Sequence, residues 1–259
     1  MLIAVAAAKG SPGVTTTAHV LASVWPGDVV LADCDPAGGD VALLGRRDGG
    51  GALDPDRGLL SLTAAVRRGL AVDALDDHLQ RIEGGLDVLC GVASPEQVTG
   101  IGPLWPTLAG VLAHAPGRDV IADCGRLTPG TPSFPVVTAA DVVVLVVRPR
   151  LEAYAHLRER LRWLAAGQGG PHAGPAVGIV LVTDPRDHQS VQDLTRLLAH
   201  SALPAAVLGR LADDARAADV VAGRVERGIS RSLLVRSARE LVGPIRALAA
   251  SRGLAAVSV

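Results

Sequence analysis

LIAVAAAKGSPGVTT, residues 2–16, joins an apolar run to a short turn that contains glycine and then to a segment of helical character. The run Leu2–Ala8 is continuously apolar, which is typical of a parallel strand covered on both faces. Gly10 and Gly13 permit positive φ values and a close approach of the backbone to a ligand. A helix that follows such a turn presents free N–H groups, so Lys9–Thr16 is predicted to be a phosphate-binding loop.

The loop differs from the ordinary phosphate-binding pattern G-x-x-x-x-G-K-[ST] at its cationic position. Val14 stands where that pattern has lysine, and the loss of one charge-assisted hydrogen bond weakens binding about 10- to 150-fold. Pro12 removes one backbone N–H, whereas Thr15 keeps the position of the hydroxyl that ligates Mg²⁺. Lys9 is the only lysine in an arginine-rich chain, which indicates a place where a slim, flexible ammonium is required. A glycine-rich turn without a ligand is the alternative interpretation of the loop taken alone.

The composition is that of one α/β domain, which we place at residues 1–259. A net charge of −1 argues against a general attraction to nucleic acid. The chain starts without the basic region of a signal peptide, and no apolar run approaches the length that a membrane span needs. We therefore expect a cytoplasmic protein in which Cys34, Cys90 and Cys124 are buried, reduced thiols.

Short apolar runs alternate with helical patterns along the whole chain, which predicts an α/β fold with a doubly wound, mostly parallel sheet and helices on both faces. The expected strands are 2–8, 29–34, 86–90, 119–124, 142–147, 177–183 and 205–208. The expected helices are 15–24, 59–68, 72–82, 104–114, 151–166, 188–200, 213–223 and 229–251, the last interrupted by Pro244.

Carboxylates follow several of the expected strands. Asp33 and Asp35 come after the second strand, and Asp123 comes near the end of a later one. Ligands of such sheets lie outside the carboxyl ends of the strands, where these residues are expected to meet the loop. One carboxylate of the Asp33–Asp35 pair can serve a metal and the other can orient an attacking water, and Asp123 can hold Mg²⁺ directly or through water. The alternative interpretation is that these carboxylates only form polar ends of strands, with a turn at Asp35, and have no ligand.

With the motif Lys-Gly-x-x-Gly-x-Thr-Thr at residues 9–16, the chain resembles the MinD/ParA superfamily of deviant Walker A ATPases. This resemblance implies a P-loop NTPase fold that binds ATP and Mg²⁺ and forms a nucleotide-linked homodimer. It implies that Lys9 reaches the phosphates of the partner subunit, that Thr15, Asp33 and Asp123 serve the metal, and that Asp35 orients the water. The nucleotide-binding residues would be Lys9, Gly10, Ser11, Pro12, Gly13, Val14, Thr15, Thr16 and Asp213.

Within that superfamily the chain looks most similar to the CpaE/TadZ-like proteins of Flp/Tad pilus systems. Two segments carry this similarity: residues 29–35 with the following Gly-Asp-Val-Ala-Leu-Leu at 39–44, and the turn at 211–217 that contains Asp213. The similarity implies a protein partner from a pilus, secretion or localisation system. It also implies a cytoplasmic location that such a partner can bring to the inner membrane face or a cell pole.

The sequence is compatible with three functions. The first is a dimerisation switch that is at most a slow ATPase. The second is a scaffold without catalysis, which is favoured by Val14, by Pro12 and by the lack of an adenine-reading Asn near residues 182–184. The third is a partitioning protein that binds DNA phosphates weakly. Its candidate contacts are Arg216, Arg224, Arg227, Arg231, Arg236 and Arg239, diluted by Asp213, Asp214, Glu226 and Glu240.

Overall fold

The structure is a computed structural model that describes residues 1–69, 72–166, 174–225 and 228–257. The described strands form one eight-stranded sheet in the order β3-β4-β2-β5-β1-β6-β7-β8. Every neighbouring pair is parallel except β3 and β4, which are antiparallel. The strands are β1 (Leu2–Ala7), β2 (Val29–Asp33), β3 (Gln80–Arg81), β4 (Asp87–Leu89), β5 (Asp119–Arg126), β6 (Val142–Val147), β7 (Ala176–Thr183) and β8 (Ala206–Ala212).

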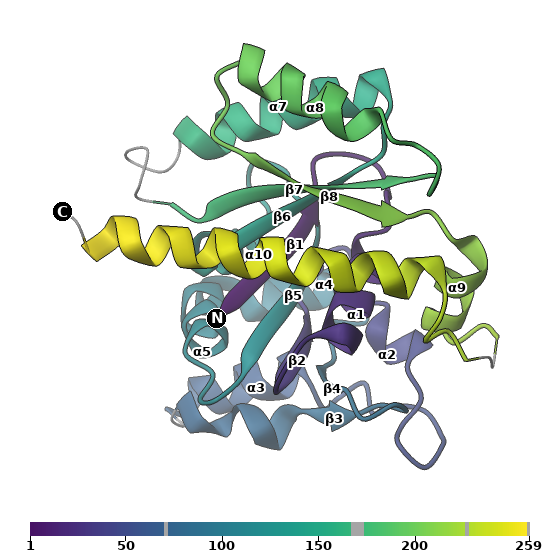
Figure 1. The fold of residues 1–259 in the computed structure, drawn as a ribbon. Coiled ribbons are helices and arrows are strands. Elements are labelled where there is room, and N and C mark those ends of the chain that lie inside the picture. The colour runs from purple at the N-terminus through teal and green to yellow at the C-terminus, as the bar shows by residue number, and fades with distance from the viewer. Residues whose placement is uncertain (70–71, 167–173, 226–227, 258–259) are drawn as a thin grey trace.

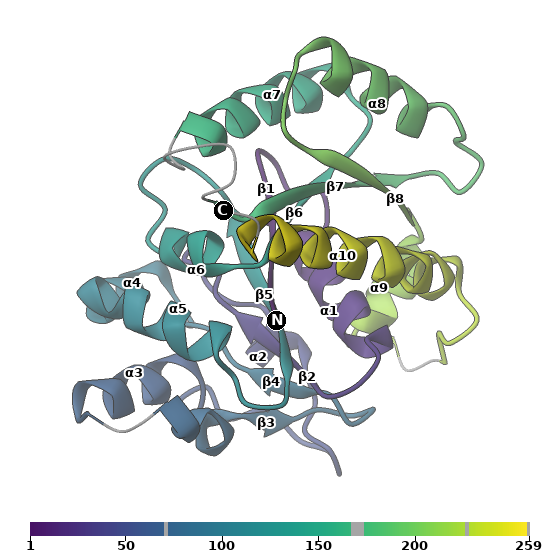
Figure 2. The same ribbon diagram turned by 60° about the vertical axis from the view of Figure 1, so that its left-hand side comes forward.

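Helices cover both faces of this sheet (Figure 1), and Figure 2 shows the sheet between the two helical layers. The layer with α1, α9 and α10 packs on one face, and the layer with α3, α5, α6, α7 and α8 packs on the other. The α-helices are α1 (Val14–Val24), α2 (Val41–Leu44), α3 (Leu59–Arg67), α4 (Pro95–Ile101), α5 (Trp105–Ala113), α6 (Phe134–Ala139), α7 (Leu151–Ala166), α8 (Ser190–His200), α9 (Ala215–Val221) and α10 (Leu233–Val257).

The central strand β1 shows why its apolar run is continuous. Leu2, Ala4 and Ala6 belong to one core cluster, and Ile3, Val5 and Ala7 belong to the other. All six side chains are buried because successive residues of a strand point to opposite faces, both of which are covered by helices. The predicted α/β fold with a mostly parallel sheet is therefore confirmed, and α7 has the predicted bounds.

One predicted helix is wrong. The segment 72–82 was expected to be helical, but it forms the 3₁₀ helix η1 (Val72–His78) and then the edge strand β3. Gln80 anchors this strand, because its side-chain Nε2 donates to the carbonyl oxygens of Asp54 and Arg57 at 2.8 Å. Tertiary hydrogen bonds thus override the local helical pattern. The short helices α2, α4 and α6, which were not predicted, have too few turns to show a helical period.

The expected interruption of the last helix at Pro244 is also wrong, because α10 is continuous through that proline. A proline inside a helix costs about 3 kcal/mol through a lost hydrogen bond and a clash with the preceding turn. Packing offsets this cost, since Leu241 and Ile245 on either side of the proline are buried against the layer that contains α1. No helix among the described residues is long and apolar enough to cross a membrane.

The three cysteines are buried and free, as predicted. Burial raises the pKa of the Cys34 and Cys124 thiols well above the ordinary value. These thiols are therefore held in the neutral, unreactive form.

Candidate functional site

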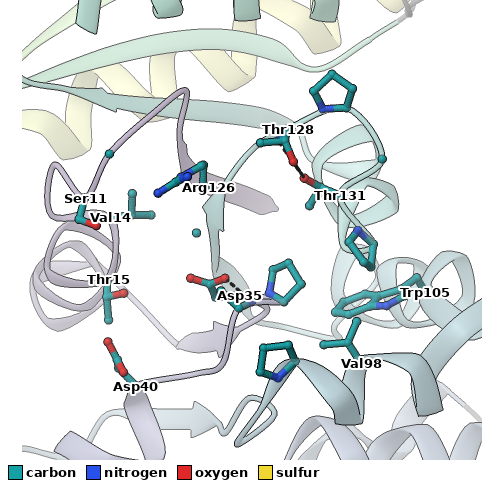
Figure 3. Close-up of a pocket in the computed structure, with 18 of the residues that line it drawn as sticks. Ser11, Val14, Thr15, Asp35, Asp40, Val98, Trp105, Arg126, Thr128 and Thr131 are labelled. Carbon is teal, nitrogen blue, oxygen red and sulfur yellow. Dashed lines mark hydrogen bonds between the residues drawn. The ribbon is translucent and has the colours of Figure 1, made fainter.

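An open cavity of about 1070 Å³ lies at the carboxyl ends of β1, β2 and β5 (Figure 3). Its walls come from the loop and first turn of α1, from the segment after β2, from the segment after β5, and from α4 with Trp105 of α5. The sheet order places these segments together, because β5 pairs with β1 on one side and with β2 on the other. The cavity is thus at the edge of the sheet where ligands of this architecture bind.

The predicted phosphate loop has the required backbone geometry. Gly10 and Gly13 have φ values of 77° and 103°, and a Cβ atom at either residue would meet nothing within 4 Å. Helix α1 begins at Val14 immediately after the second glycine, and no side chain caps its first turn. The free N–H groups and the helix dipole at this end favour a phosphate. Gly10, Ser11, Gly13, Val14, Thr15 and Thr16 line the cavity, whereas Pro12 is buried and does not.

Asp33 lies behind the cavity and does not line it. Its side chain is completely buried, and its Oδ2 accepts a hydrogen bond from the Val41 N–H at 3.1 Å. Gly39 and Gly91 are needed beside this carboxyl. A Cβ atom on Gly39 would lie 2.3 Å from Oδ2 of Asp33, and a Cβ atom on Gly91 would lie 2.8 Å from Oδ1. Burial and then the nearby charge of Asp123 raise the pKa of Asp33 to about 8. Asp33 is thus an enclosed carboxyl that tends to keep its proton near neutral pH.

Asp123 lies directly beside Asp33 in the pairing of β2 with β5 and is 1% exposed. Its carboxylate accepts a hydrogen bond from the Thr15 hydroxyl and one from the Gly125 N–H at 3.0 Å. Burial raises the pKa of Asp123 to about 6, although the bond from Thr15 opposes the rise. Thr15 therefore connects the cavity, which it lines, to the acidic residue behind it.

Asp35 is the predicted catalytic residue that reaches the cavity itself. Its Oδ1 accepts a hydrogen bond from the Ala37 N–H at 2.8 Å, and the carboxylate points into the space between the phosphate loop and α4 (Figure 3). Burial raises its pKa, and the positive charge of Arg126 opposes the rise. Gly125 is required beside it, because a Cβ atom there would lie 2.1 Å from Oδ2 of Asp35.

Oxygen donors at this site fit a magnesium ion that is shared with a nucleotide. Thr15, Asp35 and Asp40 place hydroxyl and carboxylate oxygens on the cavity wall, and Mg²⁺ prefers such ligands. Within the described ranges no group of three His, Cys, Asp or Glu side chains could hold a metal by itself. Mg²⁺ characteristically uses few protein ligands and completes its shell with water and substrate phosphates, so the sparse donor set is suitable.

Besides Pro12, two further predicted nucleotide-binding residues do not line the cavity. The Lys9 Nζ is 3.0 Å from Nε2 of His156 on α7, in an exposed position. Asp213 follows β8, where its carboxylate binds the guanidinium of Arg148, with Nη2 and Oδ1 at 3.2 Å. The Lys9 side chain thus contacts α7, and the Asp213 side chain contacts the residue that follows β6, so neither side chain is directed into the cavity.

Arg126 is a residue of the cavity that the sequence reasoning missed. It is the last residue of β5 and lies in register with Ala7 at the end of β1. Its side chain points toward Val14 and Ser11 (Figure 3). The signal was present in the sequence, because Arg126 comes only three residues after Asp123 at a strand end.

Comparison with known proteins supports the fold assignment. No protein-family model matches the chain, and no curated protein is significantly similar to it. Among solved structures, the ParA family ATPase from Chlorobium tepidum TLS has a TM-score of 0.71 at 18% identity, with 93% of this chain and 96% of that chain covered. The cell division ATPase MinD of Pyrococcus furiosus has a TM-score of 0.71 at 18% identity, with 95% of this chain and 98% of that chain covered. MinD of Pyrococcus horikoshii OT3, complexed with Mg-ADP, has a TM-score of 0.68 at 17% identity, with 97% of this chain and 98% of that chain covered.

These likenesses extend over nearly the full length of each chain and show that the protein has the MinD/ParA-like fold expected from its sequence. They do not distinguish the pilus-assembly branch from others with the same fold.

Proposed function

We propose that the protein is an ATP-binding, dimerising ATPase of the MinD/ParA type that acts as a spatial-localisation switch. The observation that carries this proposal is the joint opening of the phosphate loop, the N-terminus of α1 and the Asp35 carboxylate into one cavity. The Mg-ADP complex of the P. horikoshii MinD structure supports ATP and Mg²⁺ as the ligands.

In this proposal the backbone of residues 10–16 binds the phosphates. Its N–H groups and the dipole of α1 supply partial positive charge, with one donor fewer because of Pro12. The Thr15 hydroxyl, oriented by Asp123, faces the metal position. When bound there, Mg²⁺ would neutralise charge on the phosphate oxygens. Asp33 organises the site from behind, since its enclosed carboxyl fixes the backbone at Val41.

Asp35 has the geometry for orienting a water molecule. Its carboxylate reaches the cavity, and the hydrogen bond from Ala37 fixes one oxygen while the other stays available. A carboxylate so placed can accept a hydrogen bond from an attacking water in line with a terminal phosphate. The absence of a lysine at Val14 makes slow hydrolysis the expected behaviour.

Lys9 is proposed to complete the site of a second subunit. Its ammonium lies at an exposed position outside its own cavity, and its hydrogen-bond partner His156 is also on the surface of α7. Exchange of this exposed contact with an imidazole ring for contacts with a triphosphate would favour dimerisation, because the ammonium would then bind an acceptor that carries a full negative charge. ATP-dependent dimerisation would then create the surface for a localisation or pilus-assembly partner, as in CpaE/TadZ-like proteins.

The C-terminal arginines give less support to DNA binding. Arg224 forms a salt bridge with Asp219, and Arg239 donates to the carbonyl oxygen of Ser230. Both arginines thus already have partners within the fold. Arg227 and Glu226, which also entered the sequence prediction, lie outside the described residues. A gel shift of duplex DNA at low salt that is reversed by added salt would support DNA binding instead.

Light scattering tests the proposal with Mg·ATP, Mg·ADP and no nucleotide. Mg·ATP is expected to raise the dimer fraction of the wild type, and Lys9→Ala is expected to abolish this rise without changing the melting temperature. Arg196→Gln on α8, which removes one exposed charge elsewhere, serves as the matched control. An oligomeric state that ignores nucleotide would contradict the switch.

Phosphate release by the wild type and by Asp35→Asn separates the switch from the scaffold. A clear loss of release in the variant is expected, because the amide keeps the shape but not the charge of the carboxylate. Equal release from both proteins would favour the scaffold without catalysis.

A further inference from the structure

We propose that Arg126, from the end of β5 in the same chain, supplies the phosphate-binding cation that the loop lacks at Val14. This inference rests on the proposed nucleotide-binding function and adds a residue to that site. Its starting point is a deficit of positive charge in a cavity that is expected to receive a polyanion.

The deficit is visible in the cavity wall. Val14, at the position of the usual lysine, contributes two methyl groups and packs into the core with 8% exposure. Asp35 and Asp40 line the same cavity, so its fixed charges are mainly negative. Asp33 and Asp123 lie directly behind. Without a cation, the partial positive charge of the loop N–H groups would have to offset both the phosphates and the carboxylates of Asp35 and Asp40.

Arg126 is the one basic side chain among the described residues that line the cavity. Its side chain forms no hydrogen bond or salt bridge with any residue in the described part of the chain, and its charge acts on the nearby Asp35 carboxylate without a direct bond. The arginines of neighbouring segments, in contrast, are bonded. Arg118 pairs with Asp87, and Arg148 pairs with Asp213. A guanidinium carries five N–H donors in a planar fork that matches phosphate oxygens. The donors of Arg126 are therefore available to a ligand.

The backbone directs this side chain to the correct place. Gly125, with a φ of 57°, turns the chain between Asp123 and Arg126. The pairing of Ala7 with Arg126 then sets the arginine beside the start of the phosphate loop. Figure 3 shows the guanidinium extending from β5 toward Val14, on the side of the cavity opposite α4 and Trp105. The cation thus enters from the neighbouring strand and not from the loop helix.

This position differs from that proposed for Lys9. Lys9 points outward to His156 and would act on a second subunit, whereas Arg126 lies inside its own cavity. Arg126 should therefore strengthen nucleotide binding even at protein concentrations where the chain is monomeric. The Lys9 contribution should appear only when dimers form.

Calorimetric titration with Mg·AMPPNP, at a concentration where the protein is monomeric, tests the inference. Arg126→Gln is expected to weaken binding about 10- to 150-fold, which is the effect of one charge-assisted hydrogen bond. Val14→Lys in the Arg126→Gln background is expected to restore most of the affinity, because it returns the cation to the loop. Arg196→Gln, a charge loss on the exposed face of α8, is expected to bind like the wild type.

The outcomes separate the inference from the function on which it rests. Unchanged affinity of Arg126→Gln beside a wild type that binds well would overturn the role of Arg126 and leave nucleotide binding intact; it would make Arg126 a mere neighbour of Asp35. A loss that Val14→Lys fails to restore would also overturn it, because the arginine would not be standing in for lysine. A wild type that binds no Mg·AMPPNP would overturn both proposals. Melting curves without nucleotide identify a variant that has lost its fold, and recovery of binding in the double variant shows that the fold is intact.

Discussion

Gly125→Ala is expected to damage the proposed hydrolysis much more than it damages the fold. The added Cβ atom would lie 2.1 Å from Oδ2 of Asp35, and contacts of a Cβ atom shorter than 3.0 Å essentially never occur. The cavity side of Asp35 is open, so the carboxylate can give way by rotation. The same substitution places alanine at a φ of 57°, in the left-handed region.

The structure sets the size of both effects. The contact must lengthen by roughly 1 Å, and a displacement of this size in a positioning group can cost about 100-fold in rate. Alanine in the left-handed region costs about 1–2 kcal/mol, which lowers the melting temperature of a chain of this size by roughly 2–8 °C. We therefore expect about a 100-fold slower single-turnover phosphate release from a protein that remains folded at 25 °C.

Gly117→Ala is the matched control, because this glycine has a φ of 67° and its Cβ atom would meet nothing within 4 Å. It is expected to lose similar stability without loss of phosphate release. The assay is release of labelled phosphate from enzyme in excess over Mg·ATP, together with thermal melting of both variants. Equal rates in the two variants, or a wild type that releases no phosphate, would refute the water-orienting role of Asp35.

Three further predictions follow from other features of the fold. Gly91→Ala places a Cβ atom 2.8 Å from the enclosed carboxyl of Asp33, which cannot move aside, so overpacking should cost about 1–3 kcal/mol in a denaturant titration. Gly110→Ala, in open space within α5, should instead gain about 0.5–1 kcal/mol, and equal stabilities would contradict the packing argument. Burial lowers the pKa of His19 from 6.5 to about 4, so the neutral imidazole stabilises the fold above pH 6.5 and this contribution is lost as the pH falls toward 4. The difference between the two pKa values corresponds to at most roughly 3 kcal/mol at 1.36 kcal/mol per pKa unit, and His19→Gln should flatten the loss of stability between pH 7 and 4.5; an unchanged slope would exclude His19 as its source. Removal of Mg²⁺ with EDTA should weaken ATP binding and abolish ATP-linked dimerisation in the wild type and in the Arg196→Gln control alike, as light scattering can show. Dimerisation by metal-free ATP would count against the shared-metal site.

The strands and the phosphate loop were predictable because their signals are local. Leu2–Ala7 is apolar at every position, and a strand covered on both faces requires this pattern. Gly10 and Gly13 have the positive φ values expected of them, since only glycine adopts this conformation without strain. The placing of Asp33, Asp35 and Asp123 near the carboxyl ends of β2 and β5 followed from the general rule that ligands lie at those ends of parallel strands.

Edge and terminal elements were less predictable because distant contacts decide them. Residues 72–82 have a helical pattern, yet Gln80 is fixed by hydrogen bonds to carbonyl oxygens more than twenty positions earlier in the chain. Pro244 signals a helix break by itself, but burial of Leu241 and Ile245 outweighs the local cost. The free energies of these hydrogen bonds and of this burial depend on distant residues, so they cannot be read from a short stretch of sequence.

The sequence by itself determined the class of fold and the chemistry of the loop, because backbone freedom and apolar patterning act over a few neighbouring residues. The tertiary structure alone decided which charged side chains meet the loop. Pairing of β5 between β1 and β2 brings Arg126 and Asp35 into one cavity, while Lys9 turns to His156 and Asp213 to Arg148. Strand order is a property of the whole sheet, and Coulomb interactions depend on distance in space, so these pairings could only emerge once the chain was folded.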